Sequence, residues 1–336
     1  MIRNLALLLW ILAPPVAAQD SLSTDEFRGR VAAVPLHGKI GWYLDNVNAD
    51  APGPLIVWLP GSGAMPYFQN YADGSIGYAF PPELLAYRNE AHFLLIEKPG
   101  VPFSAQLDFD EESQRPIELD SDAYREGLTK DNLVARAAIA IRAARAELGE
   151  RATQVIIIGG SEGGQYAFAL AREVQADRVI AWGGIALPQY FDLVLEFRLQ
   201  AERGEITRSD AQNQIDELYS AIRAIEENPQ DITQRFHGEA YRRWSSFGPY
   251  YAIDDMLSLE VPLLLIQGGA DSNAPILNSD YAMIAFLSEG RTNLDYWVYP
   301  NLDHFFRDVT VDPTLPEADR SEEVWDRVWR WISADE

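Results

Sequence analysis

Residues 155–171, VIIIGGSEGGQYAFALA, combine the features of a buried strand, a sharp turn and a helix. Four consecutive β-branched residues favour a strand that is covered on both faces. Two glycines, Ser161, Glu162 and two more glycines follow, and an apolar stretch with helical spacing then begins. The pentapeptide 159–163 matches G-x-S-x-G, in which a serine occupies a tight strand-to-helix turn with its hydroxyl exposed. A phosphate-binding or purely structural glycine turn is the alternative, but neither a Walker lysine nor a G-x-G-x-x-G spacing occurs here.

The same strand-then-helix rhythm extends along most of the chain. Short apolar runs bounded by Gly and Pro predict buried strands within 54–63, 92–100, 154–160, 178–186, 261–271 and 294–304. Helical stretches are predicted over 120–148, 161–175 and 321–333. This alternation indicates an α/β fold with a mostly parallel central sheet and helices on both faces. Two earlier segments, 30–35 and 39–46, have hairpin spacing and predict an antiparallel edge.

Residues 188–259 interrupt this rhythm. The segment contains several charged helical stretches and no strand-like run. We therefore expect a helical cap, inserted into an α/β core that comprises residues 19–187 and 260–336. The acidic segment 107–122 is predicted to be an exposed loop.

The composition of the chain argues against some kinds of binding partner. The chain has 336 residues, of which 47% are hydrophobic and 23% charged, as is usual for a globular protein with a large core. Its net charge of −24 argues against binding to nucleic acid or to an anionic membrane surface. With no cysteine, the chain has neither disulfides nor thiolate metal ligands. A small molecule is the expected partner, and the oligomeric state is left open.

The first residues have the pattern of an export signal. Arg3 provides a positive start, the run 5–13 is apolar but too short to span a bilayer comfortably, and Val16 and Ala18 fit a small-residue cleavage site before Gln19. We expect a signal peptide over residues 1–18 and a periplasmic or secreted mature protein, with no stable membrane insertion after cleavage. An uncleaved N-terminal anchor is the alternative.

A serine hydroxyl needs a general base, and the chain has only four histidines. His37 precedes the predicted edge strand, His92 begins a strand, and His237 lies in the predicted cap. Only His304 falls in a loop after a strand, at the sheet edge where Ser161 is expected to emerge. We therefore predict that Ser161 is the nucleophile and His304 the base.

A carboxylate is also expected, to orient the imidazole. Asp271 ends the segment 261–271, directly after its predicted strand PLLLIQGG and inside the glycine-containing stretch GGADSNAP. Asp303 is adjacent to His304, and neighbouring side chains usually diverge, whereas Asp295 is expected to lie within a strand. Asp271 is the predicted third member of the triad.

Hydrolysis also requires N–H donors for the oxyanion of the tetrahedral intermediate. The backbone N–H of Glu162, the residue after the nucleophile, is one predicted donor. The second is expected from the loop LPGSG, through the N–H of Ser62 or Gly63. Ser62 is not a predicted nucleophile, because Pro60 and Ala64 stand where the pattern requires glycines.

Together these residues resemble serine hydrolases of the α/β-hydrolase fold. The order of Ser161, Asp271 and His304, the serine turn after a central strand and the position of the helical insertion all fit. The segments LPGSG, GGSEGG and PLLLIQGGADSNAP are similar to those of the bacterial esterase and serine-aminopeptidase-like branch, whereas the HGGG pattern of lipases is absent.

The resemblance implies hydrolysis of a carboxylic ester or amide bond through an acyl-enzyme, without a metal or other cofactor. An aminopeptidase-like serine peptidase that acts on small peptides is one alternative. A non-catalytic binding protein that keeps the fold is the other.

Substrate specificity is the least determined feature. The Glu162 side chain either stabilises the helix N-terminus electrostatically or binds a cationic group such as a substrate amine. Four more residues are predicted to border the substrate pocket, with structural or packing roles as the alternative: Glu97, Tyr67, Trp244 and Tyr250.

Overall fold

The structure, a computed structural model, describes residues 23–45, 47–48, 50–110, 112–113 and 115–334. The predicted signal peptide lies outside the described residues. Among the described residues, no helix combines the length and the apolar character needed to cross a bilayer.

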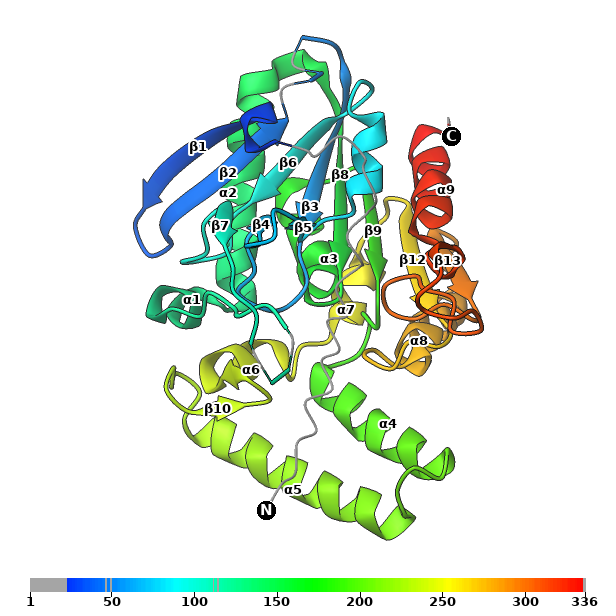
Figure 1. The fold of residues 1–336 in the computed structure, drawn as a ribbon. Coiled ribbons are helices and arrows are strands. Elements are labelled where there is room, and N and C mark those ends of the chain that lie inside the picture. The colour runs from blue at the N-terminus through cyan, green and yellow to red at the C-terminus, as the bar shows by residue number, and fades with distance from the viewer. Residues whose placement is uncertain (1–22, 46, 49, 111, 114, 335–336) are drawn as a thin grey trace.

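The central sheet has eight strands in the order β1-β2-β6-β3-β8-β9-β12-β13 (Figure 1). The first two strands form the predicted antiparallel hairpin, and β2 is also antiparallel to β6, whereas all other neighbours are parallel. The predicted α/β class and the mostly parallel sheet are therefore confirmed. The strand bounds are β1 Phe27–Val34, β2 Gly38–Asp45, β3 Gly53–Leu59, β6 His92–Ile96, β8 Ala152–Gly160, β9 Arg178–Trp182, β12 Leu263–Gly268 and β13 Leu294–Tyr299.

Helices cover both faces of this sheet, and the alternation of side chains along a strand explains how. In β3, Leu55 and Val57 belong to one hydrophobic core, which contains residues of α2, α3, α7 and α8. Ile56 and Trp58 point to the other face and belong to a second core, which contains residues of α9. These helices are α2 Lys130–Leu148, α3 Glu162–Val174, α7 Ala252–Ser258, α8 Ile276–Ser288 and α9 Ser321–Ser333.

The long helix predicted over 120–148 is divided into two. A short helix, α1 (Asp122–Gly127), ends before Leu128, and the hydroxyl of Thr129 accepts a hydrogen bond from Asn132 N–H to begin α2. A side-chain cap of this kind satisfies a backbone donor that the first helical turn leaves without a partner. The division matters for the site, because α1 and the segment before it contact the cap.

The segment predicted as the cap folds mainly as helices, α4 Gln189–Glu202, α5 Arg208–Glu227 and α6 Tyr241–Phe247. Helices α4 and α5 form a hairpin at the bottom of Figure 1, with their own small apolar cluster around Phe197 and Ile215. The prediction missed a minimal hairpin of β10 (Arg235–Phe236) and β11 (Glu239–Ala240). Helix α7 ends the segment and packs into the hydrophobic core that contains Leu55 and Val57.

Other short elements were also missed by the sequence reasoning. A three-stranded sheet, in the order β5-β4-β7, packs on the edge of the second core, and its strands have only three residues each. Strands this short carry too little periodicity to be predicted. The bounds are β4 Phe68–Asn70, β5 Ile76–Tyr78 and β7 Ser104–Gln106, and the 3₁₀ helices are η1 Thr24–Glu26, η2 Pro82–Tyr87, η3 Gly149–Arg151 and η4 Pro316–Ala318.

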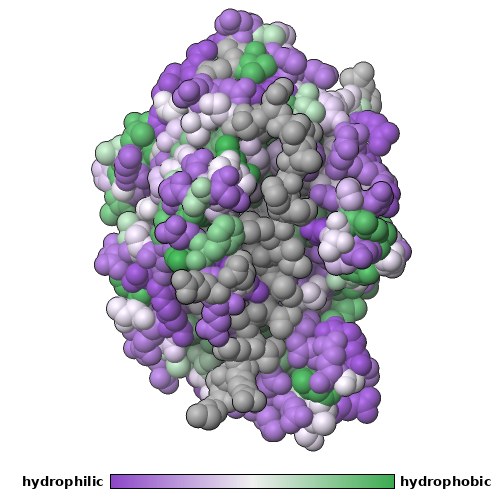
Figure 2. Space-filling view, in the orientation of Figure 1, coloured by the Kyte–Doolittle hydropathy of each residue, from purple (hydrophilic) through white to green (hydrophobic). Residues whose placement is uncertain are grey.

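The face of the molecule drawn in Figure 2 is mostly hydrophilic. Figure 2 shows that hydrophilic residues predominate over the described part of this face, with apolar residues in small scattered groups. A hydrophilic face of this kind is what a chain with 23% charged residues is expected to present to water.

Candidate active site

Ser161 occupies a sharp turn between β8 and α3. Its backbone has φ 52° and ψ −121°, a conformation that residues other than glycine rarely adopt. The turn is held from below, because Ser161 N–H donates a hydrogen bond of 2.8 Å to Trp182 O at the end of β9. Strained backbone of this kind concentrates at functional sites, where the surrounding structure over-determines it.

Gly163 explains why this turn needs small residues. A Cβ at this position would lie 2.1 Å from Leu59 O and 2.8 Å from Pro60 O. The turn therefore lies directly against the end of β3 and the start of the LPGSG loop. The glycines permit the close approach of helix and strand that the motif predicts.

His304 and Asp271 are joined by a hydrogen bond of 2.7 Å between His304 Nδ1 and Asp271 Oδ2. The carboxylate is fixed by three further donors, Asn273 N–H and Ala274 N–H on Oδ1 and the Gln267 amide on Oδ2. Because an ionised carboxylate only accepts, Nδ1 carries the proton and Nε2 is left to act as the base.

The environment of His304 raises the pKa of its imidazole. Burial disfavours the charged imidazolium, but the attraction of Asp271 outweighs it, so the pKa of His304 is raised above its usual value. The side chain of Asp271 is only 1% exposed, so water screens this attraction weakly.

The two competing carboxylates have other partners. Asp303 Oδ1 accepts from the backbone N–H groups of Phe305 and Arg307, and so shapes the loop that carries His304. Asp295 Oδ2 accepts from the indole of Trp331 on α9. Neither carboxylate bonds the His304 ring within the described part of the chain.

The loop of His304 is placed beside the serine turn through Gly183. A Cβ on Gly183 would lie 2.6 Å from His304 Cε1, and the preceding residue, Trp182, accepts the hydrogen bond from Ser161 N–H. Among the described residues no hydrogen bond joins Ser161 to His304. Catalytic hydrogen bonds are often long without a substrate and tighten when one binds.

The predicted oxyanion donors are available. Glu162 N–H belongs to the first residue of α3, where no intrahelical acceptor exists. The N–H groups of Ser62 and Gly63 likewise have no acceptor within the described chain. Gly63 has a φ of 92°, which lets the loop turn inward, and the Gly163 contacts place this loop against the serine turn.

The Glu162 side chain is buried in a network that the sequence did not reveal. Its residue is 1% exposed, and Oε2 accepts two hydrogen bonds from Arg243 of α6, at 2.9 and 2.6 Å. Its Oε1 lies 3.5 Å from Lys98 Nζ. Burial disfavours the ionised carboxylate, but the two cations outweigh it and lower the pKa of Glu162 below its usual value. The carboxylate is therefore buried and already paired with two cations.

Three of the predicted pocket residues are in packed positions. Tyr67 is 4% exposed and its hydroxyl donates to Ile96 O at 3.0 Å. Trp244 stacks on Tyr190 within the cap, and its indole donates to Phe236 O. The hydroxyl of Tyr250 bonds Asp255, and Lys130 lies over its ring. The packing alternative accounts for the observed contacts of each residue.

Glu97 lies at a different place. Its Oε1 accepts from the Tyr43 hydroxyl and from Phe103 N–H. It lines a cavity of about 970 Å³ beside the β1–β2 hairpin and the N-terminus of α2, and no member of the predicted triad lines that cavity. The hydrogen bonds of the Glu97 side chain in the described part of the chain are thus to Tyr43 and Phe103, not to the predicted triad.

Comparison with known proteins supports the fold. No family model and no curated protein matches the chain, but solved structures do. A Pyrococcus horikoshii acylaminoacyl peptidase aligns with 91% of this chain and 41% of its own, at 14% identity and a TM-score of 0.53. A puromycin-hydrolyzing peptidase of Mycobacterium tuberculosis aligns with 93% of this chain and 41% of its own, at 15% identity and a TM-score of 0.53.

A shorter protein aligns over its whole length. An esterase of Pyrococcus furiosus matches 96% of this chain and 97% of its own, at 13% identity and a TM-score of 0.52. This chain spans about two fifths of the length of the two peptidases. At such low identities the similarity establishes the fold, which is the α/β-hydrolase fold.

Proposed function

We propose that this protein is a serine hydrolase that cleaves a carboxylic ester or amide bond through an acyl-enzyme. The observation that carries the proposal is the hydrogen bond between buried Asp271 and His304, next to a serine on a strained turn. Each group has the chemistry that one role in a catalytic triad requires.

In the first half of the reaction, Ser161 Oγ attacks the carbonyl carbon while His304 Nε2 takes the hydroxyl proton. The resulting imidazolium is stabilised by Asp271, and the negative oxygen is bound by Glu162 N–H and by Ser62 or Gly63 N–H. His304 then gives the proton to the leaving alcohol or amine, the bond to the leaving group breaks, and the acyl group remains on Ser161.

In the second half, water replaces the leaving group. His304 removes a proton from water, whose oxygen attacks the acyl carbon, and the same N–H groups bind the second oxyanion. Collapse of the intermediate returns the proton to Ser161 Oγ and releases the carboxylic acid. No step requires a cofactor.

Carboxylic esters are the first substrate class to test, and small peptides are the second. The esterase neighbour supports the former and the two peptidases the latter, and the same triad serves both reactions. Because Glu162 is paired with Lys98 and Arg243, it does not supply the amine site that the peptidase alternative suggested.

The test compares the wild-type protein with Ser161→Ala. Hydrolysis of p-nitrophenyl esters of graded chain length is measured beside hydrolysis of aminoacyl-p-nitroanilides, and labelling by a fluorophosphonate is followed by mass spectrometry. The proposal expects the wild-type protein to be labelled at Ser161 and the variant to be inactive but folded. Undiminished hydrolysis by the variant, or labelling at another residue, contradicts it.

The rival of another class is a binding protein that keeps the fold without catalysis. It predicts neither labelling nor turnover with either substrate series, together with saturable binding of a ligand to the wild-type protein. The complete set of triad residues and the N–H donors without acceptors support the enzyme instead.

We also propose export, on the pattern of residues 1–18 alone. Expression of the full chain in a bacterium, followed by fractionation and N-terminal sequencing, tests this proposal. A mature protein that begins at Gln19 in the periplasm or medium supports it, whereas an intact N-terminus in the cytosol contradicts it.

A further inference from the structure

Lys98 occupies an unusual position between the serine turn and the loop of the second oxyanion donor. It follows β6 and is 5% exposed. Its ammonium group donates to Gly61 O and, at 2.9 Å, to Gly63 O, and lies 3.5 Å from Glu162 Oε1. These three acceptors match the three donors of an ammonium group.

The two carbonyl contacts fix the direction of particular N–H groups. In a trans peptide the carbonyl and the N–H of one unit point in opposite directions. Because Gly61 O points at Lys98, the N–H of Ser62 points away from it, and this N–H has no acceptor within the described chain. The peptide unit between Gly63 and Ala64 has the same arrangement. Gly63 O accepts from Lys98, and Ala64 N–H points the other way and donates to Glu118 at 2.8 Å.

Glu162 extends this arrangement to the other oxyanion donor. Its backbone N–H is the donor from the serine turn, and its side chain contacts Lys98, which anchors the loop of Ser62. One buried ion network therefore joins both halves of the proposed oxyanion hole. Removing one charge from such a network leaves its partner buried and uncompensated, so the remaining groups must rearrange.

The third member of the network comes from the cap. Arg243 of α6 binds Glu162 Oε2 through Nε and Nη2, and its guanidinium packs over the rings of Trp244 and Phe247. The position of Glu162, and through it that of Lys98, therefore depends on how α6 sits on the core. Both donors of Arg243 converge on the same oxygen of Glu162, and charge-assisted hydrogen bonds of this kind are short and strong.

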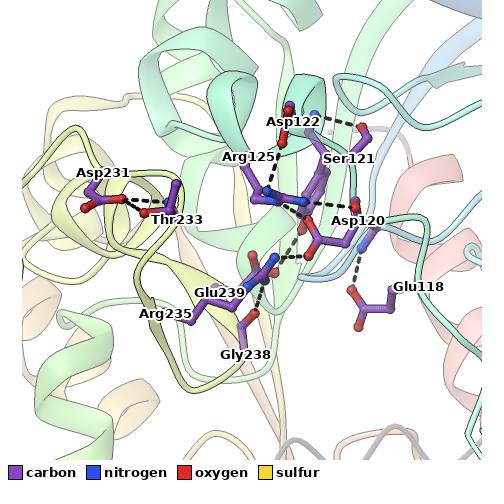
Figure 3. Close-up of polar contacts among 12 residues, drawn as sticks. Glu118, Asp120, Ser121, Asp122, Arg125, Asp231, Thr233, Arg235, Gly238 and Glu239 are labelled. Atoms are coloured by element: carbon purple, nitrogen blue, oxygen red, sulfur yellow. Dashed lines mark hydrogen bonds and ion pairs between the residues drawn. The ribbon is translucent and has the colours of Figure 1, made fainter.

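A second contact between cap and core reaches the same loop (Figure 3). Asp120 accepts from Arg125 of the core and from Arg235 of the β10–β11 hairpin. Two residues earlier, Glu118 holds the N–H of Ala64. The cap thus reaches the loop by two routes. Arg243 binds Glu162, which contacts Lys98, and Arg235 binds Asp120 in the segment that bonds Ala64.

We propose that Lys98 is a positioning residue for the oxyanion hole. We also propose that Arg243 makes the geometry of this hole depend on how the cap packs on the core. Lys98 selects Ser62 N–H, rather than Gly63 N–H, as the second donor. Arg243 holds Glu162, which holds Lys98. The inference rests on the proposed serine hydrolase function for its catalytic consequence, but the orientation of the loop does not depend on activity.

The experiment compares Lys98→Met and Arg243→Met with the wild-type protein, with kcat and KM measured on one p-nitrophenyl ester. Loss of one oxyanion donor typically lowers kcat by 10²–10³, so a misdirected donor is expected to lower kcat by about 10- to 100-fold in Lys98→Met. We expect KM to change less than about threefold, and Arg243→Lys to recover part of the kcat that Arg243→Met loses.

Arg88→Met is the matched control, because it breaks another largely buried ion pair, with Asp45 at 2.7 Å, away from the site. It is expected to lower thermal stability without lowering kcat per folded molecule. If Lys98→Met does not fold, Glu162→Gln carries the same test, since it keeps the size of the side chain and removes its charge. Unchanged kcat in folded Lys98→Met or, in its place, in Glu162→Gln overturns the inference.

Hydrogen exchange of the peptide 58–65 provides a readout that needs no activity. Ala64 N–H bonds Glu118 in the wild-type protein, so faster exchange at Ala64 in Lys98→Met and Arg243→Met, but not in Arg88→Met, supports the positioning role. Unchanged exchange in the first two variants overturns it. If the wild-type protein neither hydrolyses esters nor reacts with a fluorophosphonate, the proposed function fails, and the exchange data still decide the role of Lys98.

Discussion

His304 Nδ1 donates a 2.7 Å hydrogen bond to Asp271 Oδ2, while the other oxygen of that carboxylate accepts from two backbone N–H groups of its own loop. The imidazole is thereby fixed in one tautomer, with Nε2 available as a base. This relationship links residues 33 positions apart in the sequence, on the loops that follow β12 and β13.

The pH dependence of kcat/KM should follow from this pair. Burial lowers the pKa of His304, the Asp271 charge raises it by more, and the net pKa lies above the usual 6.5. Because the base must be neutral, kcat/KM should rise with pH through a pKa above 6.5. In Asp271→Asn burial remains without the charge, so the acid limb should move to lower pH while kcat falls by roughly 10³–10⁴.

Asp303→Asn is the control for this profile. Asp303 contributes a smaller attraction to His304 and makes no hydrogen bond to its ring among the described residues. Its acid limb should shift less than that of Asp271→Asn. A limb that moves to higher pH in Asp271→Asn would show that the carboxylate does not stabilise the imidazolium.

Glycine at position 161 should make the folded protein more stable than a residue with a side chain does. At φ 52° and ψ −121° a side chain is strained by roughly 1–3 kcal/mol, whereas glycine adopts this conformation readily. Ser161→Gly should therefore raise the melting temperature relative to Ser161→Ala, although glycine costs about 0.5–1 kcal/mol of backbone entropy. Both variants should be inactive, and equal or lower stability of the glycine variant would argue against strain at this turn.

The serine turn was predictable because its signal is local. The β-branched run, the glycines around Ser161 and the following apolar helix are all within 17 consecutive residues. The strand-and-helix alternation likewise predicted the parallel sheet, since continuous apolar runs reflect burial on both faces. Asp271 and His304 could be chosen because parallel strands end at one edge of the sheet.

The network around Glu162 could not be predicted in the same way. Arg243 lies 81 residues from Glu162, in a cap whose docking is not encoded by a periodic pattern. Trp244 follows Arg243 directly and was predicted to border the pocket, but it packs inside the cap against Tyr190. Aromatic residues near an interface have the same sequence pattern whether they line a pocket or fill a core.

Gly183→Ala should lower kcat by displacing the catalytic imidazole. The added methyl group would lie 2.6 Å from His304 Cε1, so the ring must move. Displacement of a reacting group by about 1 Å can cost roughly 100-fold in rate, and we expect a loss of this order in kcat. The measurement is kcat on an ester substrate together with the melting temperature.

Gly204→Ala is the matched control for Gly183→Ala. Both glycines have positive φ, 86° at Gly183 and 76° at Gly204, so both substitutions incur a similar backbone penalty of about 1–2 kcal/mol. A methyl group on Gly204 would meet nothing within 4 Å. Its kcat should be unchanged, and an equal loss of kcat in both variants would indicate backbone strain rather than contact with His304.

Glu83 should make the protein less stable as the pH rises. Burial in η2, together with Asp319 and Glu322 nearby, raises the pKa of Glu83 to about 7, against 4.5 for an ordinary glutamate. The folded state therefore binds more protons than the unfolded state between pH 4.5 and 7, and stability falls across that window. Glu83→Gln should gain roughly 1–2 kcal/mol at pH 8, allowing for partial exposure, and almost nothing at pH 4.5. Thermal unfolding at both values tests this, with the exposed Glu112→Gln as control, and an equal gain at the two pH values would rule out titration of Glu83 as the cause.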